Sequence, residues 1–205
     1  GQSALARLVS GLASPDGGTM LVSSEAIQNL SPKAVQDAGI GRIPEDRHHD
    51  GVIGAMSVVE NLVIERLQEA EVQKRGFLQR ASIRAHAEKL SKDYVIRGPG
   101  IDAEARLLSG GNIQKLILAR VFEAQPQLIL ANQPTRGLDL GAANEVARRL
   151  LEARMRGAGV LLISEDLDEV LALSDRILVI HDGHLQEAAR KDREAIGLMM
   201  AGEPS

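Results

Sequence analysis

Apolar residues recur along the chain with two different periods, and these periods predict alternating helices and strands. A spacing of i, i+3, i+4 predicts a helix packed on a core, at Ile113, Leu116, Ile117 and Val121. Short, mostly apolar runs predict strands at 40–43, 128–131, 160–163 and 177–180. The run at 160–163 is continuous, which is typical of a strand buried on both faces of a parallel sheet. Helices alternating with such strands indicate an α/β fold with a largely parallel sheet.

Local signals mark further elements. A helix is predicted over residues 1–12, with its apolar face at Leu5, Leu8, Val9 and Leu12. Ser31 before Pro32 predicts the N-cap and the first position of a short helix. A later helix is expected to turn an inner side to the core, at Ala143, Val146, Ala147, Leu150 and Leu151. Asp182 and Gly183 are a hairpin turn signal between two strands.

Residues 52–107 read as a largely helical stretch. Val58, Leu62 and Val63 would form the apolar face of one helix, and a second helix is expected to run through His86 to Tyr94. The basic residues between the two helices are interpreted as a solvated face.

Composition narrows the class of protein. The 205 residues suit one domain, and a hydrophobic share of 44 % is enough for a core. A net charge of -4 and very few aromatic residues make nucleic acid an unsuitable main partner. The sequence has no cysteine, which excludes disulfides and thiolate metal sites and fits a cytosolic protein. No apolar run reaches the roughly 18 residues of a membrane-spanning helix.

Candidate chemistry gathers between residues 108 and 139. Ser109, Gly110 and Gly111 precede the first predicted core helix, where glycine amides and the helix dipole favour an anion such as phosphate. The alternative is that Ser109 is only an N-cap and the glycines only a turn. Asn132 and Gln133 follow a buried strand, and ligands of α/β sheets bind at such carboxyl ends.

The strings LSGGNIQK at 108–115 and LILANQPTRGLD at 128–139 resemble the signature motif, Walker B strand and D-loop of ABC-type ATPases. The LSGGN and PTRGLD forms resemble the second nucleotide-binding domain of importers in which two such domains are fused, which serve sugars and nucleosides. The resemblance extends over nearly the whole sequence. It implies a P-loop NTPase-like ABC nucleotide-binding domain, with a largely parallel sheet and a helical subdomain.

The resemblance also implies how this one discontinuous domain is divided. Residues 1–51 would be a core part with the tail of the phosphate loop and the Q-loop, 52–107 the helical subdomain, and 108–205 the rest of the core. Gly1, Gln2 and Ser3 match the end of the phosphate loop, so the domain is expected to be N-terminally truncated. The positions carried over as ATP-binding are Gln2, Ser3, Glu45, Ser109, Gly110, Gly111, Asn112, Gln114 and Asp139.

Glu45 replaces the usual glutamine of the Q-loop, Asn112 and Ile113 are mild departures in the signature, and four positions that hydrolysis needs also depart from the family pattern. Gln2 stands for the phosphate-loop lysine, Asn132 for the magnesium-site aspartate, Gln133 for the catalytic glutamate and Glu165 for the switch histidine. Hydrolysis of this type needs a cation on phosphate, a carboxylate for Mg²⁺ and a group that orients water. Ser3 and Asn132 would occupy the Mg²⁺ positions. The domain alone is therefore expected to be nearly inactive, while its signature completes the ATP and Mg²⁺ site of a partner domain.

The implied partners are another ABC nucleotide-binding domain, membrane permease subunits and, indirectly, a periplasmic or lipoprotein substrate-binding protein. The implied place is the cytoplasmic side of the plasma membrane, and the ANQPTRG form favours nucleoside uptake. Two alternatives stay open. A homodimeric ABC ATPase of sugar uptake would show turnover by the isolated domain. A non-transport ABC-like structural or regulatory module would bind DNA tightly and in a salt-dependent way.

Overall fold

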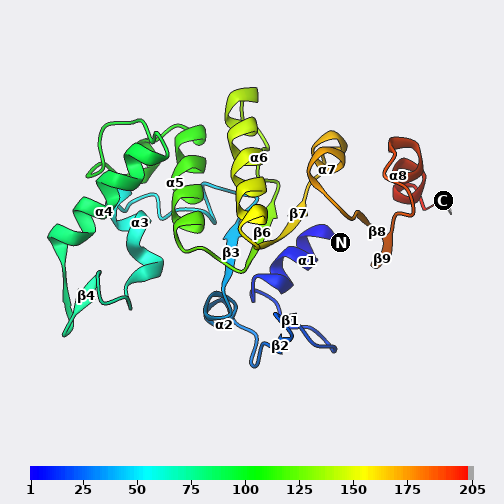
Figure 1. Cartoon of the computed structure of the whole chain (residues 1–205), viewed down its shortest axis with the longest axis horizontal. Coiled ribbons are helices and arrows are strands. Elements are labelled where there is room, and N and C mark those ends of the chain that lie inside the picture. The colour runs from blue at the N-terminus through cyan, green and yellow to red at the C-terminus, as the bar shows by residue number, and fades with distance from the viewer. Residues whose placement is uncertain (203–205) are drawn as a thin grey trace. The chain divides into compact units, whose positions relative to one another are not determined.

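The structure, a computed structural model, describes residues 1–202. Helices and strands alternate along these residues (Figure 1). The elements are α1 (Gln2–Val9), β1 (Leu21–Val22), β2 (Glu25–Ala26), α2 (Pro32–Asp37), β3 (Ile40–Ile43), α3 (Val58–Val63), η1 (Ile64–Arg66), β4 (Gln73–Lys74), β5 (Phe77–Leu78), α4 (Arg80–Asp93), η2 (Ala105–Leu107), α5 (Gly110–Glu123), β6 (Leu128–Asn132), α6 (Leu140–Met155), β7 (Gly159–Ile163), α7 (Leu167–Leu173), β8 (Leu178–His181), β9 (His184–Glu187) and α8 (Arg193–Met200).

The chain divides into two compact units. One comprises Gly1–Arg42, Gln127–Gln133 and Leu150–Ser205, and the other comprises Ile43–Pro126 and Pro134–Arg149. We refer to them as the sheet unit and the helical unit. The predicted subdomain at 52–107 falls within the helical unit, and its boundaries stay a prediction. Residues 203–205 of the predicted last segment lie outside the described residues.

A three-stranded sheet in the order β3-β6-β7 organises the sheet unit (Figure 1). β6 and β7 are parallel, and their register runs from Leu128 opposite Gly159 to Asn132 opposite Ile163. The predicted strands at 40–43, 128–131 and 160–163 and the parallel pairing are therefore confirmed. Helix α1 covers the strands because its buried Ala6 packs in one cluster with Leu130.

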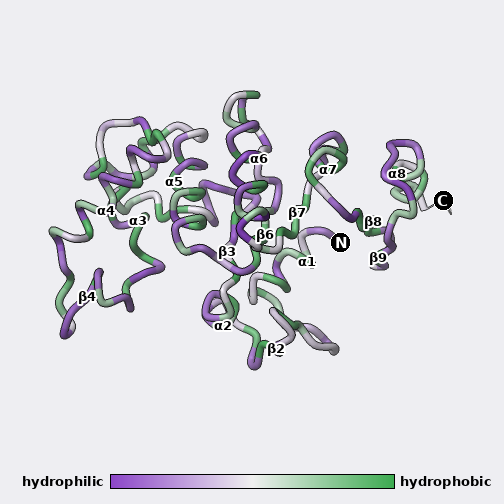
Figure 2. The backbone as a smooth tube through the Cα atoms, in the orientation of Figure 1, coloured by the Kyte–Doolittle hydropathy of each residue, from purple (hydrophilic) through white to green (hydrophobic). Residues whose placement is uncertain are grey.

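The expected burial of β7 on both faces is wrong. Ile163 is buried, but residues 160–162 are only half-buried. β7 is the outer strand of the described sheet, and a groove of about 390 Å³ runs along it. Figure 2 shows the hydrophobic residues of this strand. The periodicity gave the strand correctly, but it carries no information about which strand lies at the edge.

Two leucines expected in the core are exposed instead. Leu12 is 46 % exposed because α1 ends at Val9 and Gly11 turns the chain with a φ of +70°. Leu151 is 38 % exposed, since the next residue after the buried Leu150 points to another side of the helix. The remaining signals in this unit hold. Ser31 caps α2, where its side chain accepts a hydrogen bond from the Ala34 amide at 3.2 Å.

The last part of the sheet unit is a hairpin followed by a helix. β8 and β9 are antiparallel, and His181 pairs with His184 across the predicted turn. Asp182 and Gly183 both have positive φ, at 46° and 78°, as a type I′ turn requires. Helix α8 packs on this hairpin through a small apolar cluster of Ile177, Val179, Ile196 and Met199.

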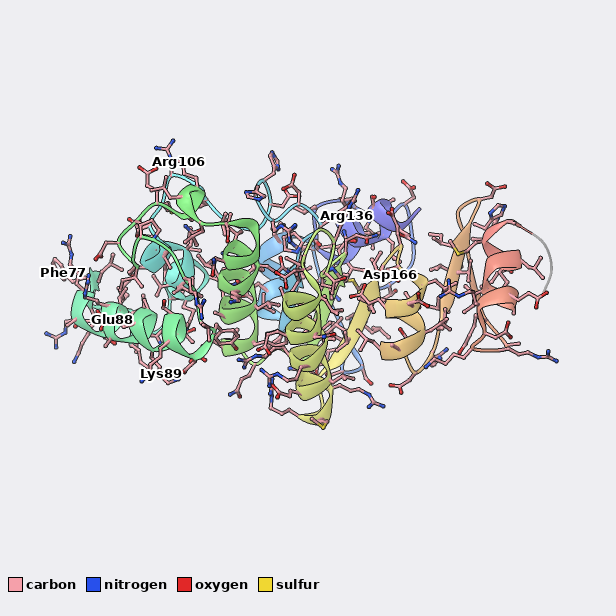
Figure 3. The ribbon with its side chains drawn as sticks, turned by 90° about the horizontal axis from the view of Figure 1, so that it is seen from above. Phe77, Glu88, Lys89, Arg106, Arg136 and Asp166 are labelled. Atoms are coloured by element: carbon pink, nitrogen blue, oxygen red, sulfur yellow. The ribbon has the colours of Figure 1, made fainter. Side chains whose placement is uncertain are left out.

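Helices α3, α4 and α5 pack together in the helical unit. Ser57 and Glu60 form a capping box at the start of α3, and the predicted Val58, Leu62 and Val63 face is buried. Helix α4 begins at Arg80, earlier than the His86 start expected from the sequence. The hairpin β4–β5 was not predicted, because two-residue strands are too short to show a period. Phe77 in this hairpin is 76 % exposed (Figure 3).

No helix among residues 1–202 combines the length and the apolarity that crossing a membrane requires.

We expect the chain to associate through the outer edge of β7. An edge strand offers unpaired backbone groups, and the β7 sequence GVLLI carries no charge that would block pairing. Val160→Lys should lower the apparent mass at high concentration, whereas Leu12→Lys, at an exposed position outside the sheet, should not. Light scattering over a concentration series measures this. An unmodified chain that is monomeric at every concentration would contradict the prediction.

Candidate functional site

The predicted signature turn lies at the start of α5 in the helical unit. Ser109 occupies the N-cap position, but its side chain does not bond to the backbone of the helix. Its Oγ instead accepts a hydrogen bond from Asn112 Nδ2 at 2.8 Å. Gly110 and Gly111 are the first helical residues, whose N–H groups have no acceptor within a helix. A side chain at Gly111 would meet nothing within 4 Å, so its backbone is open to approach.

A cavity of about 560 Å³ lies beside this turn. Ser109, Gly111, Asn112 and Asp139 line it, which brings together four of the residues predicted to contact ATP. Asp139 is oriented by its own helix, because its Oδ1 accepts a hydrogen bond from the Ala142 amide at 2.9 Å. The cavity therefore joins the N-terminal ends of α5 and α6.

The same cavity has an aromatic and charged wall that sequence reasoning missed. Tyr94, Lys115, Arg148 and Arg149 line it, and the Arg149 guanidinium lies 4.2 Å from the centre of the Tyr94 ring. Asp93 and Glu145 also line the cavity, and Glu145 pairs with both Arg148 and Arg149. Tyr94 is the chain's single tyrosine, and that scarcity was the one available signal.

Gln114 connects α5 to the turn that follows β6. Its side chain is 3 % exposed, and Nε2 donates to the Pro134 carbonyl at 2.8 Å. The amide nitrogen of Gln114 is thus directed to the protein itself. Its predicted contact with nucleotide stays a prediction.

Glu45, at the predicted Q-loop position, pairs with a residue that the sequence did not single out. Glu45 Oε1 lies 2.7 Å from Arg136 Nη1, and Arg47 Nη2 donates to the Arg136 carbonyl at 2.8 Å. Arg136 is marked in Figure 3. The loop between these groups is stabilised by Asp46, whose pKa is lowered because its carboxylate accepts hydrogen bonds from the His49 and His48 amides.

The strand end in the sheet unit holds the residues at the predicted catalytic positions. Gln133 is 8 % exposed and adopts a positive φ of 51°. Its Oε1 accepts a hydrogen bond from the Glu165 amide at 3.3 Å, so these two predicted positions meet. Asn132 ends β6 opposite Ile163. Within residues 1–202, no three His, Asp or Glu side chains are grouped so that they could hold a metal ion.

Gln2 and Ser3 begin α1 in the same unit. Gln2 lines the groove along β7 together with Ser164. Ser3 is exposed on the helix. Gly1 lies tightly against β8, because a side chain there would overlap the Ile180 side chain.

The chain matches a known protein family. Residues 1–136 match the ABC transporter family. The chain belongs to this family. It is 40 % identical over 205 residues to the nucleoside import ATP-binding protein NupA of Lactococcus lactis, a match that covers 98 % of this chain and 40 % of that protein. It is 42 % identical over 207 residues to a glucose import ATP-binding protein of Haloferax volcanii, covering 98 % of this chain and 38 % of the relative. The chain thus spans about two fifths of the length of these curated relatives.

Solved ABC cassettes share the fold. A nucleotide-free ATP-binding cassette from an ABC transporter superposes with a TM-score of 0.70 at 25 % identity, covering all of this chain and 81 % of that cassette. A dimeric post-hydrolysis cassette bound to ADP and phosphate superposes with a TM-score of 0.75 at 21 % identity, covering 91 % and 79 %. The expected P-loop ABC ATPase fold, with a parallel sheet and helices, is therefore confirmed.

The buried bond of Gln114 leads to a prediction about stability. Gln114→Leu removes the side-chain donor, so the buried Pro134 carbonyl loses its hydrogen bond. This loss should lower the free energy of unfolding by about 1–3 kcal/mol. Gln28→Leu, at an exposed glutamine, should change the stability little. Urea unfolding followed by circular dichroism measures both variants. Equal midpoints for the two would show that the bond contributes nothing.

Proposed function

We propose that this chain is an ATP-binding domain of an ABC importer, the second of two fused in one protein. Its signature would complete the ATP site of the partner domain, while its own site is degenerate. The observation that carries the proposal is the contrast between two places. The turn at 109–111 presents open backbone amides at a helix start, whereas the strand end carries Asn132 and Gln133 where a hydrolytic site needs carboxylates.

Three features of the signature turn support the proposal that it completes the ATP site of a partner domain. Helix α5 is 14 residues long, so its dipole favours an anion at Gly110 and Gly111. The Ser109 side chain does not occupy these amides, since it bonds to Asn112 instead. Bulk is absent from Gly111, which allows a phosphate from a partner domain to approach closely.

The strand end does not fit Mg-ATP hydrolysis. Mg²⁺ prefers carboxylate oxygens, and the residues here are the neutral amides of Asn132 and Gln133. The Gln133 side-chain oxygen is also engaged by the Glu165 amide. The Glu165 carboxylate is exposed at the same end of the sheet, where a negative charge would repel a γ-phosphate. No catalytic step is therefore assigned to these residues.

The proposed cofactors are ATP and Mg²⁺ at the partner's site, and the proposed cargo is a nucleoside or a sugar. Support comes from the ANQPTRG string and from relatives named for nucleoside import. Guanosine is named for one of these, a 39 % identical Bacillus subtilis protein of which this chain covers 40 %. The proposed partners are a second nucleotide-binding domain, permease subunits and, through them, a periplasmic or lipoprotein substrate-binding protein. The chain itself would lie at the cytoplasmic side of the membrane.

The isolated chain should hydrolyse ATP negligibly, because both acidic positions carry amides. Purified chain assayed with Mg-ATP for phosphate release tests this. Turnover at about 1 s⁻¹ or more, the lower end of common enzyme rates, would favour the homodimeric ATPase instead. Tight, salt-dependent binding of DNA by the same preparation would favour the structural or regulatory module.

The proposal assigns a function to the signature turn but not to the strand end at Asn132 and Gln133, and this difference can be tested in the assembled importer. Ser109→Arg should abolish transport-coupled hydrolysis, because its bulk blocks the approach of phosphate to the amides. Gln133→Ala should reduce hydrolysis far less, since that side chain lies at the degenerate site. The hydrolysis rates of the two variants should be compared at equal amounts of assembled importer, and thermal melting should show that both are folded. A Gln133→Ala defect as large as that of Ser109→Arg would show that the strand end is needed for function.

A further inference from the structure

Three loops of the helical unit meet at one arginine. We infer that Arg47 is a positioning residue, which holds the signature turn in register with the turn at 134–137 and is itself held by the Glu45–Arg136 ion pair. The inference rests on the proposed function for its consequence, because the signature turn is the part that would serve the partner's ATP site. The geometry of the three loops stands independently of that function.

The first step is the fixed backbone on both sides of Arg47. Asp46 Oδ1 accepts hydrogen bonds from the His48 and His49 amides, each at 2.9 Å. The Asp50 amide donates to the Asp46 carbonyl at 2.8 Å and closes the turn. A side chain at Gly51 would overlap both the Arg47 carbonyl and Ile117 of α5, so the loop lies directly on this helix. The Arg47 side chain therefore starts from an ordered backbone.

The second step is the contact of Arg47 with two glycines. Its Nε lies 3.5 Å from the place that a Cβ at Gly110 would occupy, so the guanidinium packs on the signature turn. Its Nη2 lies 3.1 Å from the corresponding place at Gly137. Gly137 also has a φ of +66°, which favours glycine. One planar group thus fills the space between the two turns.

The third step is the ion pair that closes the arrangement. Arg47 Nη2 donates to the Arg136 carbonyl at 2.8 Å, while the Arg136 side chain returns to Glu45 at 2.7 Å. Arg136 is thereby tied to the 44–50 loop through both its backbone and its side chain. An exposed pair of this kind adds little to global stability, but loops open locally at low cost, so the same pair can control their order.

The turn at 134–137 is held from the opposite side as well. Gln114 of α5 donates to the Pro134 carbonyl at 2.8 Å. Because α5 begins with the signature glycines, the helix and the turn form one bonded frame. Arg47 is the component that joins the 44–50 loop to this frame.

Hydrogen exchange of the full chain tests the positioning directly. Arg47→Ala should speed exchange of the hydrogen-bonded amides of Asn112, Ile113 and Leu138 about fivefold, the scale of losing one ordinary hydrogen bond. Arg84→Ala removes another arginine of the same unit, one paired with Asp102 at 2.8 Å, and should leave these amides unchanged. Exchange that is unaltered in Arg47→Ala, or raised equally in every peptide, would overturn the inference.

Two further variants separate geometry from charge. Arg47→Lys keeps the charge but loses the planar group that reaches both turns, so it should behave like Arg47→Ala. The double variant Glu45→Arg with Arg136→Glu restores the ion pair with its charges reversed, so its amide exchange rates should match those of the unmodified chain. Each single variant should exchange faster. If amide exchange in the double variant is as fast as in the single variants, the ion pair does not hold the loop.

The assembled importer then separates this inference from the proposed function. If both hold, Arg47→Ala should lower kcat for ATP hydrolysis with little change in KM, since a displaced signature weakens the transition state. Faster exchange with normal kcat would support the positioning and overturn the proposed role of the signature. Unchanged exchange would overturn the positioning, whatever the hydrolysis rate.

Discussion

The parallel pairing of β6 with β7 is the interaction that positions the residues at the ends of these two strands. Its register places Asn132 opposite Ile163, so the residues that follow each strand emerge at the same edge. Gln133 continues the pairing, because its amide donates to the Ile163 carbonyl at 2.8 Å. The Gln133 side chain then meets the Glu165 amide without any further ordering. A slip of this register would separate the two groups and turn the strand's apolar side chains to the wrong face.

A different principle organises the signature region, where hydrogen bonds to backbone carbonyls replace strand pairing. Gln114 and Arg47 donate to the carbonyls of Pro134 and Arg136, two residues apart in one turn. Carbonyl acceptors are insensitive to which side chain the turn carries. The turn can therefore expose charged residues, such as Arg136, while its backbone remains fixed by α5 and by the 44–50 loop.

The sequence predicted the elements that bury a periodic apolar face or carry a local capping or turn signature, and missed features that depend on distant neighbours. The α5 face and the parallel strands were found because burial imposes a period, and Ser31 was found because capping has a local signature. The edge position of β7 and the β4–β5 hairpin depend on neighbours distant in the sequence. Arg47 and Arg136 were missed for a related reason: 89 positions separate them, and an arginine in a polar loop looks the same whether it is solvated or bonded.

Under the proposed function, the different chemistry of the two sites explains how one chain could carry both a working signature turn and a degenerate strand end. A signature turn acts through amides and a helix dipole, which are fixed by the backbone and do not depend on the residues after β6. In that proposal, hydrolysis depends on a cation, two carboxylates and an imidazole, and the resemblance assigns these roles to positions that here carry Gln2, Asn132, Gln133 and Glu165. Without a carboxylate to bind the metal, the other groups would contribute little to hydrolysis, because the metal would no longer orient the phosphate on which they act. The turn could therefore serve a partner domain that has the complete set, whichever residues end β6.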